Sequence, residues 1–287
     1  MRLTTKIITG IILSIFLLSL LFIIAFSFSD RKYNVNAHYI NTVYIPQGHN
    51  ATIKLEPHQV IVFEAEDTFS DNDTAYYFSF NETSGLFLNP ATAADSDSEL
   101  IIPEALSGCI TTQTNNDTLT VILHLNEVRQ KYSETDKSIR KRKGIRYLTL
   151  ISGINLYLYT ARVNVINNVN HLQMLVNNIV TDSIMVNSAG GLVIDSCRAA
   201  VMIPVLANYN NLTIKNSGIQ ALHLDLDKTG KWTIENCDIE KEILSGSGRH
   251  HTTNNRQESR KLTWNPKNES AELVITLKND TAQIIFP

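Results

Sequence analysis

The chain has 287 residues, with 25 basic and 28 acidic side chains and a formal net charge of −3. Hydrophobic residues make up 43% of it and charged residues 18%, which excludes a disordered chain and a charged coiled coil. The charge also excludes a wholly basic nucleic-acid-binding protein, and three cysteines are too few for a disulfide-dense scaffold. The length is sufficient to bury one large β core or two smaller ones.

The N-terminal region contains an apolar run of 22 residues, 7–28, without a charge. At about 1.5 Å per residue it is long enough to cross a hydrocarbon layer of roughly 30 Å. Arg2 and Lys6 precede the run, which favours a cytoplasmic N-terminus over residues 1–6 and an extracytoplasmic remainder. A cleaved signal peptide ending at Ala25-Phe26-Ser27 is the alternative, but the run is longer than the usual signal core of about 7–15 residues.

We therefore predict a single-pass membrane protein, with residues 7–28 as a transmembrane helix and the C-terminal domain in the periplasm or at the cell surface. The part beyond the helix has 23 basic and 28 acidic residues, a net charge of about −5. Such a surface has no general attraction to nucleic acid, so no nucleic-acid partner is expected.

Residues 38–130 are predicted to form an N-terminal β segment. Short runs of β-branched and aromatic residues are separated there by Asn, Asp, Ser, Gly and Pro, as is typical of strands joined by turns. The runs are Thr42–Ile45, Ala51–Leu55, Val60–Phe63, Tyr76–Phe80 and Leu119–Leu125. The one helical stretch, residues 127–138, lacks a sustained apolar face and is predicted to be a connector.

A repeat of 20 residues marks the second half of the chain. Its copies are Gly191–Cys197, Asn211–Ser217 and Lys231–Cys237. A weaker period of about ten is visible in runs that end on asparagine, at 165–168, 175–178 and 184–187. Short strands recurring at this period, with no helical pattern between them, predict a β-solenoid or β-helix of about 20-residue coils over residues 145–245.

Two positions of each copy are expected to point inward. Stacked strands lie about 4.8 Å apart, so equivalent residues form ladders along the stack. The inward ladders are Leu192, Leu212 and Trp232, and Ile194, Ile214 and Ile234.

The next positions are polar and are expected at the bends. Ser196, Asn216 and Asn236 can bond their own backbone and the next coil. The ladder of Asp195, Lys215 and Glu235 alternates in sign, which favours a solvated structural ladder over an acid–base site.

The cysteines are predicted to be unpaired. Cys197 and Cys237 occupy equivalent positions two coils apart, so their α-carbons should be about 9.6 Å apart, beyond the roughly 7 Å that a disulfide can bridge. Cys109 is expected to be a buried thiol, and no metal site is predicted because no Cys-x-x-Cys motif is present.

Residues Leu172 to Gly246, preceded by Tyr147–Leu156 and Asp117–Val121, resemble bacterial head-GIN, or autotransporter-adhesin head, domains. The resemblance covers half to two thirds of the chain and rests on pattern and order. It implies an envelope protein with a β-solenoid fold. The turns depart from the Gly-rich turns of the family, since asparagine dominates and glycine accounts for only 12 of 287 residues. The family offers no agreed functional residues, so none is carried over.

Two polar stretches could bind a ligand or lie in solvated loops. The only dense basic run, within 137–146, could contact an acidic glycan or phosphate, but a solvated loop is favoured. His250 and His251 could ligate a metal, yet adjacent histidines point in different directions and no third ligand is evident, so a polar loop is predicted over 246–261. Residues 262–287 break the repeat and are predicted to be C-terminal cap strands.

An aromatic pair on one strand, Tyr157 and Tyr159, could stack on sugar rings, although core packing or a pair on the sheet surface is favoured. A second set combines acidic and basic groups in the manner of β-helical polysaccharide lyases. Its members are Asp225, Asp227, Lys228 and Arg198. The coils lack the long insertions that build a cleft, so this enzyme interpretation is not favoured.

The sequence therefore favours a non-enzymatic, membrane-anchored extracytoplasmic protein with a binding, adhesin-like or structural role at the cell envelope. Its expected partners are the membrane and an envelope protein or glycan. No catalytic, cofactor-binding or metal-binding residue is assigned. The alternative is a β-helical carbohydrate-active enzyme, a lyase or hydrolase, acting through Asp225 and Asp227.

Overall fold

The computed structural model describes Ser19 and residues 40–65, 68–71, 74–80, 84–91, 98–132, 144–150, 153–160, 162–207, 210–254 and 259–277. These residues form strands β1 to β23, a short 3-10 helix, η1 (Glu104–Leu106), and the helix α2 (Leu125–Tyr132), so the all-β prediction is confirmed. No helix among them is long and apolar enough to cross a membrane. Apart from Ser19, the predicted membrane segment 7–28 lies outside the described residues.

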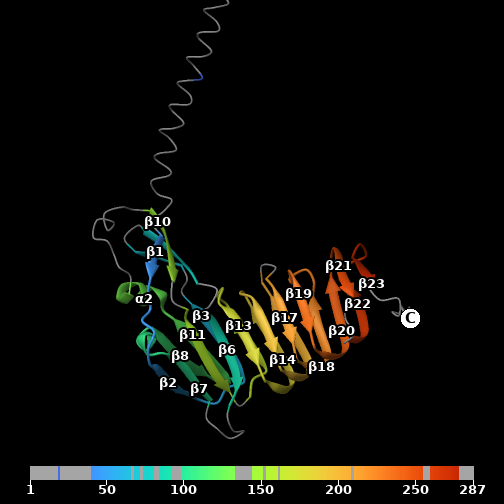
Figure 1. Ribbon diagram of the computed structural model, residues 1–287, viewed down its shortest axis with the longest axis horizontal. Coiled ribbons are helices and arrows are strands. Elements are labelled where there is room, and N and C mark those ends of the chain that lie inside the picture. The colour runs from blue at the N-terminus through green and yellow to red at the C-terminus, as the bar shows by residue number, and fades with distance from the viewer. Residues whose placement is uncertain are drawn as a thin grey trace, which may run out of the picture.

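Two large sheets contain most of the strands and run along the molecule (Figure 1). The nine-stranded sheet has the order β22 (Ser259–Pro266), β20 (Asp238–Gly246), β18 (Gly218–Asp225), β16 (Arg198–Leu206), β14 (Val180–Ser188), β12 (Val165–Asn168), β3 (Val60–Ala65), β9 (Thr118–Leu123) and β8 (Ile110–Asn115). The eight-stranded sheet has the order β19 (Trp232–Glu235), β17 (Leu212–Lys215), β15 (Leu192–Asp195), β13 (Gln173–Asn177), β6 (Gly85–Pro90), β11 (Asn155–Thr160), β7 (Ser98–Pro103) and β2 (Asn50–Leu55).

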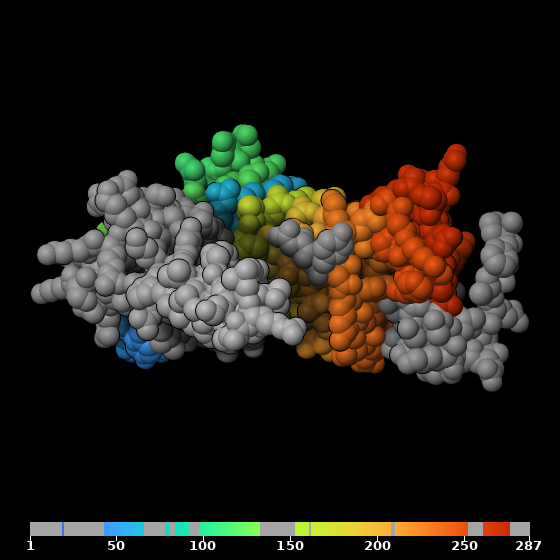
Figure 2. Space-filling view, turned by 90° about the horizontal axis from the view of Figure 1, so that it is seen from above, coloured from blue at the N-terminus to red at the C-terminus, as the bar shows by residue number. Residues whose placement is uncertain are grey.

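From β13 to β20 the chain alternates between the two sheets, and we call one strand of the eight-stranded sheet with the following strand of the nine-stranded sheet a coil. Successive coils pair in parallel. Leu192 pairs with Leu212 and Leu212 with Trp232, which confirms the 20-residue spacing there. Between β13 and β15 the offset is 18 residues, because Met174 pairs with Leu192. Seen from above, the coils follow one another in sequence order along the body, from yellow through orange to red (Figure 2).

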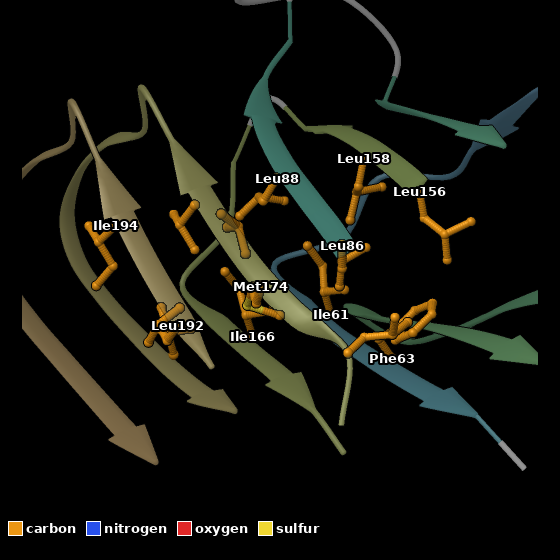
Figure 3. Packing of buried hydrophobic residues seen from close by; sticks show 14 of the residues in the cluster. Ile61, Phe63, Leu86, Leu88, Leu156, Leu158, Ile166, Met174, Leu192 and Ile194 are labelled. Atoms are coloured by element: carbon orange, nitrogen blue, oxygen red, sulfur yellow. The ribbon is translucent and has the colours of Figure 1, made fainter. Parts of the chain in front are cut away.

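The core lies between the two sheets. Leu192, Leu212, Ile194 and Ile214 are at most 1% exposed, as predicted, and the core continues into the N-terminal strands (Figure 3). Side chains of the eight-stranded sheet such as Leu86 and Met174 lie there beside Ile61 and Ile166 of the nine-stranded sheet. The two inward residues of the last copy, Trp232 and Ile234, are only half-buried, so the core opens toward that end of the eight-stranded sheet.

The bends that follow the strands of the eight-stranded sheet contain residues in the left-handed backbone conformation. Asn178, Ser196, Asn216 and Asn236 have φ between 52° and 56°, a region that asparagine tolerates because its side chain bonds locally. Asn236 Nδ2 donates to Asn216 Oδ1 at 2.8 Å, and Asn216 Nδ2 donates to Asp195 Oδ1 at 3.0 Å. The predicted side-chain bonds between coils are therefore confirmed at Asn216 and Asn236, whereas Ser196 Oγ donates to Asp195 Oδ1 of its own coil at 2.9 Å.

The charged ladder is confirmed where Lys215 Nζ lies 3.1 Å from Asp195 Oδ2. The hydrogen bond from Asn216 is the main reason that the pKa of the Asp195 carboxyl is lowered, with smaller contributions from Lys215 and Ser196. Two neighbouring coils therefore share one neutralised pair at this bend.

The N-terminal strands do not repeat in this way. β6 pairs with β13 and β11, and β3 pairs with β12, so the N-terminal segment shares both sheets with the coils. Antiparallel pairs join β2 to β7, β7 to β11 and β8 to β9. The sheets are therefore mixed, and a solenoid of one repeating unit does not describe the whole β region. The physical reason is that antiparallel strands, β7 and β2 in one sheet and β8 in the other, cover the first end of the stack, where no preceding coil is available.

One strand that was predicted to begin the coils lies elsewhere. β10 (Gly144–Leu150) belongs to a four-stranded sheet with the order β1 (Ile40–Val43), β10, β5 (Thr74–Ser79) and β4 (Thr68–Asp71). Its residues pair in parallel with β1 and β5, not with a coil. The start of the coil region at residue 145 is therefore wrong.

The C-terminal predictions also need correction. β22 pairs with β20 at the 20-residue offset, Leu244 with Trp264, so the repeat continues past residue 262. The segment 246–261, predicted to be a loop, contains β21 (Arg249–Asn254), which pairs in parallel with β23 (Glu272–Leu277). Backbone pairing to a parallel neighbour, β20 for β22 and β23 for β21, forms these strands even though their side-chain patterns are polar. Residues 278–287, the last part of the predicted cap, lie outside the described residues.

All three cysteines are buried and free. Cys197 and Cys237 follow the same bend two coils apart, with Ser217 between them, and the prediction that they form no disulfide is confirmed. Cys109 is 2% exposed, which confirms the predicted buried thiol.

Candidate functional site

A groove of about 660 Å³ runs across the ends of adjacent strands of the nine-stranded sheet. We call it the strand-end groove. It is lined by Val62, Asn167, Asn168, Val169, Asn187, Ser188, Ala189, Val205, Leu206, Ala207, Asp227 and Lys228. These residues come from the middle of β3, from the ends of β12, β14 and β16, and from the turn after β18, so the groove crosses five neighbouring segments of the stack.

One row of the groove consists of paired residues on adjacent strands. Asn167 pairs with Val62 on one side and with Asn187 on the other, and Asn187 pairs with Val205. Asn187 Nδ2 donates to Asn167 Oδ1 at 2.5 Å. The row therefore presents two uncharged amides between two valines.

The neighbouring residue, Asn168, is 2% exposed and also lines the groove. Its Nδ2 donates to the carbonyl of Leu172 at 2.8 Å and to Ser188 Oγ at 3.2 Å, which fixes the orientation of the amide. Its Oδ1 is buried and has no hydrogen-bond partner among the described residues. A buried acceptor without a partner costs about 1–3 kcal/mol, so a donor that reached this atom would recover that free energy.

The wall of the groove is formed by small or short side chains. Val169, 61% exposed, and Ala189 and Ala207 occupy equivalent positions just after their strands. Their backbone N–H groups donate to carbonyls of the adjacent strand, those of Phe63, Asn168 and Ser188, at 2.9–3.0 Å. The backbone is therefore satisfied within the stack, and the small side chains leave the groove open.

Asp227 marks the charged end of the groove. Its Oδ1 accepts hydrogen bonds from the backbone N–H of Ser247 at 2.8 Å and contacts His250 Nε2 at 3.0 Å. Lys267 Nζ lies 2.9 Å from Asp227 Oδ2 and 2.5 Å from Asp225 Oδ1. The Ser247 N–H, followed by Lys267, holds the pKa of Asp227 far below its usual range, and the two carboxylates, Asp225 first, raise the pKa of Lys267.

The four residues proposed for lyase-like chemistry are not brought together. Asp225 and Asp227 meet Lys267, which the sequence did not single out, and Lys228 lies near them in the groove lining. Arg198 pairs with Gly218, the first residue of β18. Asp225 is the last residue of β18 and lies about 23 Å away along that strand. An ionised Asp227 does not carry the proton that a general acid must donate at neutral pH.

Arg198 instead lines a second hollow of about 330 Å³, where the strands of the nine-stranded sheet begin. Its acidic neighbours in that lining are Asp182, Asp238 and Glu240. The two hollows therefore lie at opposite ends of the same strands.

The two histidines have different surroundings. His250 is half-buried, bonded to Asp227 and edge-on to Trp264 with the ring centroids 6.1 Å apart, whereas His251 is exposed. Among the described residues, no group of three His, Cys, Asp or Glu side chains is placed to hold a metal ion.

The tyrosine pair lies on the eight-stranded sheet. Tyr157 is half-buried and stacks on Phe87, with the ring centroids 4.8 Å apart, which confirms a pair on the sheet surface. Tyr159 pairs with Asn89. Of the basic run, residues 137–143 lie outside the described part of the chain, and Arg146 is in β10.

The residues that the sequence interpretation missed are the groove asparagines. A signal was present, because strands ending on asparagine at 167–168 and 187 recur at the 20-residue spacing. The pattern indicated bends. It did not indicate that the side chains of these residues line one groove.

No protein-family model matches the sequence, and no curated protein matches it. Solved structures are similar to it in three dimensions. A "putative adhesin" from Bacteroides fragilis has 13% identity and a TM-score of 0.48, covering 82% of this chain and 96% of that one. A "putative adhesin" from Parabacteroides distasonis has 8% identity and a TM-score of 0.47, covering 83% and 98%. A "putative lipid binding protein" from the same organism has 9% identity and a TM-score of 0.44, covering 83% and 98%.

Proposed function

We propose that the chain is a membrane-anchored extracytoplasmic β-solenoid protein that binds an extended partner at the cell envelope, in the manner of an adhesin and without catalysis. The strand-end groove carries this proposal. It crosses five neighbouring segments of a stack, it is open because small side chains form its wall, and it contains one orphaned buried acceptor, Asn168 Oδ1. A concave site with a few placed polar groups among apolar ones is the usual form of a binding site.

The charged end of the groove supports binding over catalysis. Asp225 and Asp227 are both held by Lys267, and Asp227 also accepts the Ser247 N–H, so the acidic groups are already occupied by partners within the chain. The anchoring part of the proposal rests on the uncharged run 7–28, which is long enough to span a bilayer. Its topology follows from Arg2 and Lys6 on the N-terminal side.

The enzyme alternative has one observation in its favour, because Asp227 lines the groove and contacts His250 and Lys267. A carbohydrate-active enzyme would use these groups on a polysaccharide lying in the groove. This alternative predicts turnover that is lost in Asp227→Asn.

The test uses the full chain in detergent micelles on an array of glycans and peptides. Ala207→Trp fills the groove wall, whereas Ala221→Trp places the same ring on the outer face of the nine-stranded sheet, outside the groove lining. We expect wild type and Ala221→Trp to bind alike and Ala207→Trp to lose binding. Binding that survives Ala207→Trp, or release of new chain ends from acidic polysaccharides, would contradict the proposal.

A further inference from the structure

We propose that the ligand of the strand-end groove is a neutral, polyhydroxylated chain, a segment of glycan, one of whose hydroxyls donates to Oδ1 of Asn168. The inference rests on the proposed function, because it names the ligand class of the same groove. Four properties of the lining carry it: the orphaned acceptor, the absence of net charge, the extended shape, and the satisfied backbone.

The orphaned acceptor selects for a donor. Asn168 Oδ1 has no partner among the described residues, although the amide is fixed by the bonds of Nδ2 to Leu172 O and Ser188 Oγ. A ligand O–H placed there removes the cost of the buried acceptor, which a ligand without a donor leaves in place.

The lining selects against charge. It contains one carboxylate, Asp227, and one ammonium, Lys228, so its net charge is zero. Asp227 is already bonded to Ser247 and Lys267. The lining contributed by β3, β12, β14 and β16 has only amide, hydroxyl and aliphatic side chains. An anionic or cationic ligand would give up its hydration there without meeting a counter-charge.

The shape selects an extended chain with polar and apolar faces. Five neighbouring segments at about 4.8 Å spacing give a path of about 19 Å. The amides of Asn167 and Asn187 lie in the same row between Val62 and Val205. Sugar units present hydroxyls at their edges and C–H groups on their faces, which matches this combination of polar and apolar groups.

The backbone selects against an extended peptide. A peptide that adds to a sheet gains affinity from unpaired backbone N–H and C=O groups. The N–H groups of Val169, Ala189 and Ala207 already donate within the stack. The groove therefore offers side-chain amides, which bond hydroxyls, and no open row of backbone donors.

The experiment measures binding of the full chain in detergent micelles to neutral hexasaccharides (cello-, malto-, xylo-, laminari- and chitohexaose). Oligogalacturonate and short Gly/Ser peptides serve as charged and peptidic probes. Asn187→Ala removes one amide of the groove row, and Asn177→Ala removes its match outside the groove, where Asn177 Nδ2 donates to Asn89 Oδ1 at 3.3 Å. We expect one neutral hexasaccharide to bind, with about a fivefold to tenfold loss in Asn187→Ala and none in Asn177→Ala.

The bonded hydroxyl is located with monodeoxy analogues of that sugar. We expect one monodeoxy analogue to bind the wild type about tenfold more weakly than the parent sugar, and to bind Asn168→Leu as tightly as the parent sugar does. The affinity of the wild type for the parent sugar should change less than about twofold between about 0.05 and about 0.5 M NaCl. If Asn168→Leu does not fold, the affinity of Asn187→Ala and the salt dependence decide by themselves whether the ligand is a neutral glycan. If the acidic sugar or the peptides bind the wild type, and this binding is lost in Ala207→Trp, the neutral-glycan inference is overturned and the proposed function is kept. Absence of any binding sensitive to Ala207→Trp would overturn both.

Discussion

Lys267 Nζ lies 2.9 Å from Asp227 Oδ2, although the two residues occupy equivalent positions two coils apart. Two spacings of about 4.8 Å separate their backbones, and the four-carbon stem of the lysine bridges the gap. Ser247 lies in the coil between them and donates its N–H to the same carboxylate. Cys197 and Cys237 are also two coils apart and remain free, because their side chains are too short to span that distance.

This bridge should stabilise the C-terminal coils modestly. Lys267→Met removes the partner of both Asp225 and Asp227, and because the lysine is 38% exposed we expect a loss of about 0.5–1 kcal/mol in the free energy of unfolding. Denaturant midpoints measure the change. Lys231→Met is the control, since Lys231 is exposed and no ion pair involving it is present among the described residues. Equal effects of the two changes would show that the bridge contributes nothing specific.

The same carboxylate should make stability depend on pH. The pKa of Asp227 is depressed in the folded state, so its contribution is fully present above the unfolded value of about 3.9 and is lost as the pH falls toward the folded value. We expect Asp227→Asn to cost about 1 kcal/mol at neutral pH and progressively less below about pH 4. Urea unfolding at a series of pH values measures this difference, and a gap that stayed constant down to about pH 2 would contradict it.

The coils could be predicted because each repeat contains its own pattern. Leu192 and Ile194 stand two positions apart and are followed by the polar Asp195, and the same pattern recurs at Leu212, Ile214 and Lys215. The insertion of β6 between β11 and β13 could not be predicted, since the pairing of Leu86 with Met174 depends on a segment far away in the sequence. Local patterns predict which face is buried but do not identify the partner strand.

The candidate site was only partly accessible from the sequence. Asp227 and Lys267 are two periods apart, and extending the 20-residue register past residue 246 would have connected them. That extension was missed because β22 contains Arg260, Lys261 and Pro266, whose polar or N–H-lacking character hides the strand pattern. The orphaned Oδ1 of Asn168 depends on side-chain orientation, which no spacing predicts.

The bend at Asn216 should be sensitive to substitution for two separable reasons. Asn216 has φ 52° and takes part in two ladder bonds, from Asn236 and to Asp195. Asn216→Ala should cost about 2 kcal/mol in the free energy of unfolding, because it loses both bonds and because alanine tolerates the left-handed region less well than asparagine does. Asn216→Gly loses the bonds only, so it should recover about 1 kcal/mol of that loss. Thermal unfolding of the three proteins checks this, and a glycine variant no more stable than the alanine variant would exclude the backbone contribution.

The thiols should be unreactive in the folded protein. Burial raises the pKa of the Cys197 thiol to about 11 and also raises that of Cys109, and all three cysteines are buried. Because the thiolate is the reacting form, a chromogenic disulfide reagent at about pH 8 should label no thiol within minutes in the native protein and all three in denaturant. Rapid native labelling of Cys197 would contradict its burial, and a count of one thiol in denaturant would indicate a disulfide.

Gly190 is a position of the stack where a single added methyl group should be strongly destabilising. A Cβ built on it would lie 2.1 Å from the backbone oxygen of Leu172 and 2.7 Å from the carbonyl carbon of the same residue, so adjacent segments of the stack would have to move apart. The neighbouring Gly191 offers a matched control, because the nearest atom to its Cβ is Gln173 Cγ at 3.9 Å. We expect Gly190→Ala to lower the free energy of unfolding by about 3 kcal/mol or more and Gly191→Ala to change it by less than about 1 kcal/mol. Since Gly190 follows Ala189 of the groove wall, Gly190→Ala should also weaken ligand binding, whereas Gly191→Ala should not. Equal stability of the two variants in denaturant would show that the coils are not packed as closely here as the structure places them.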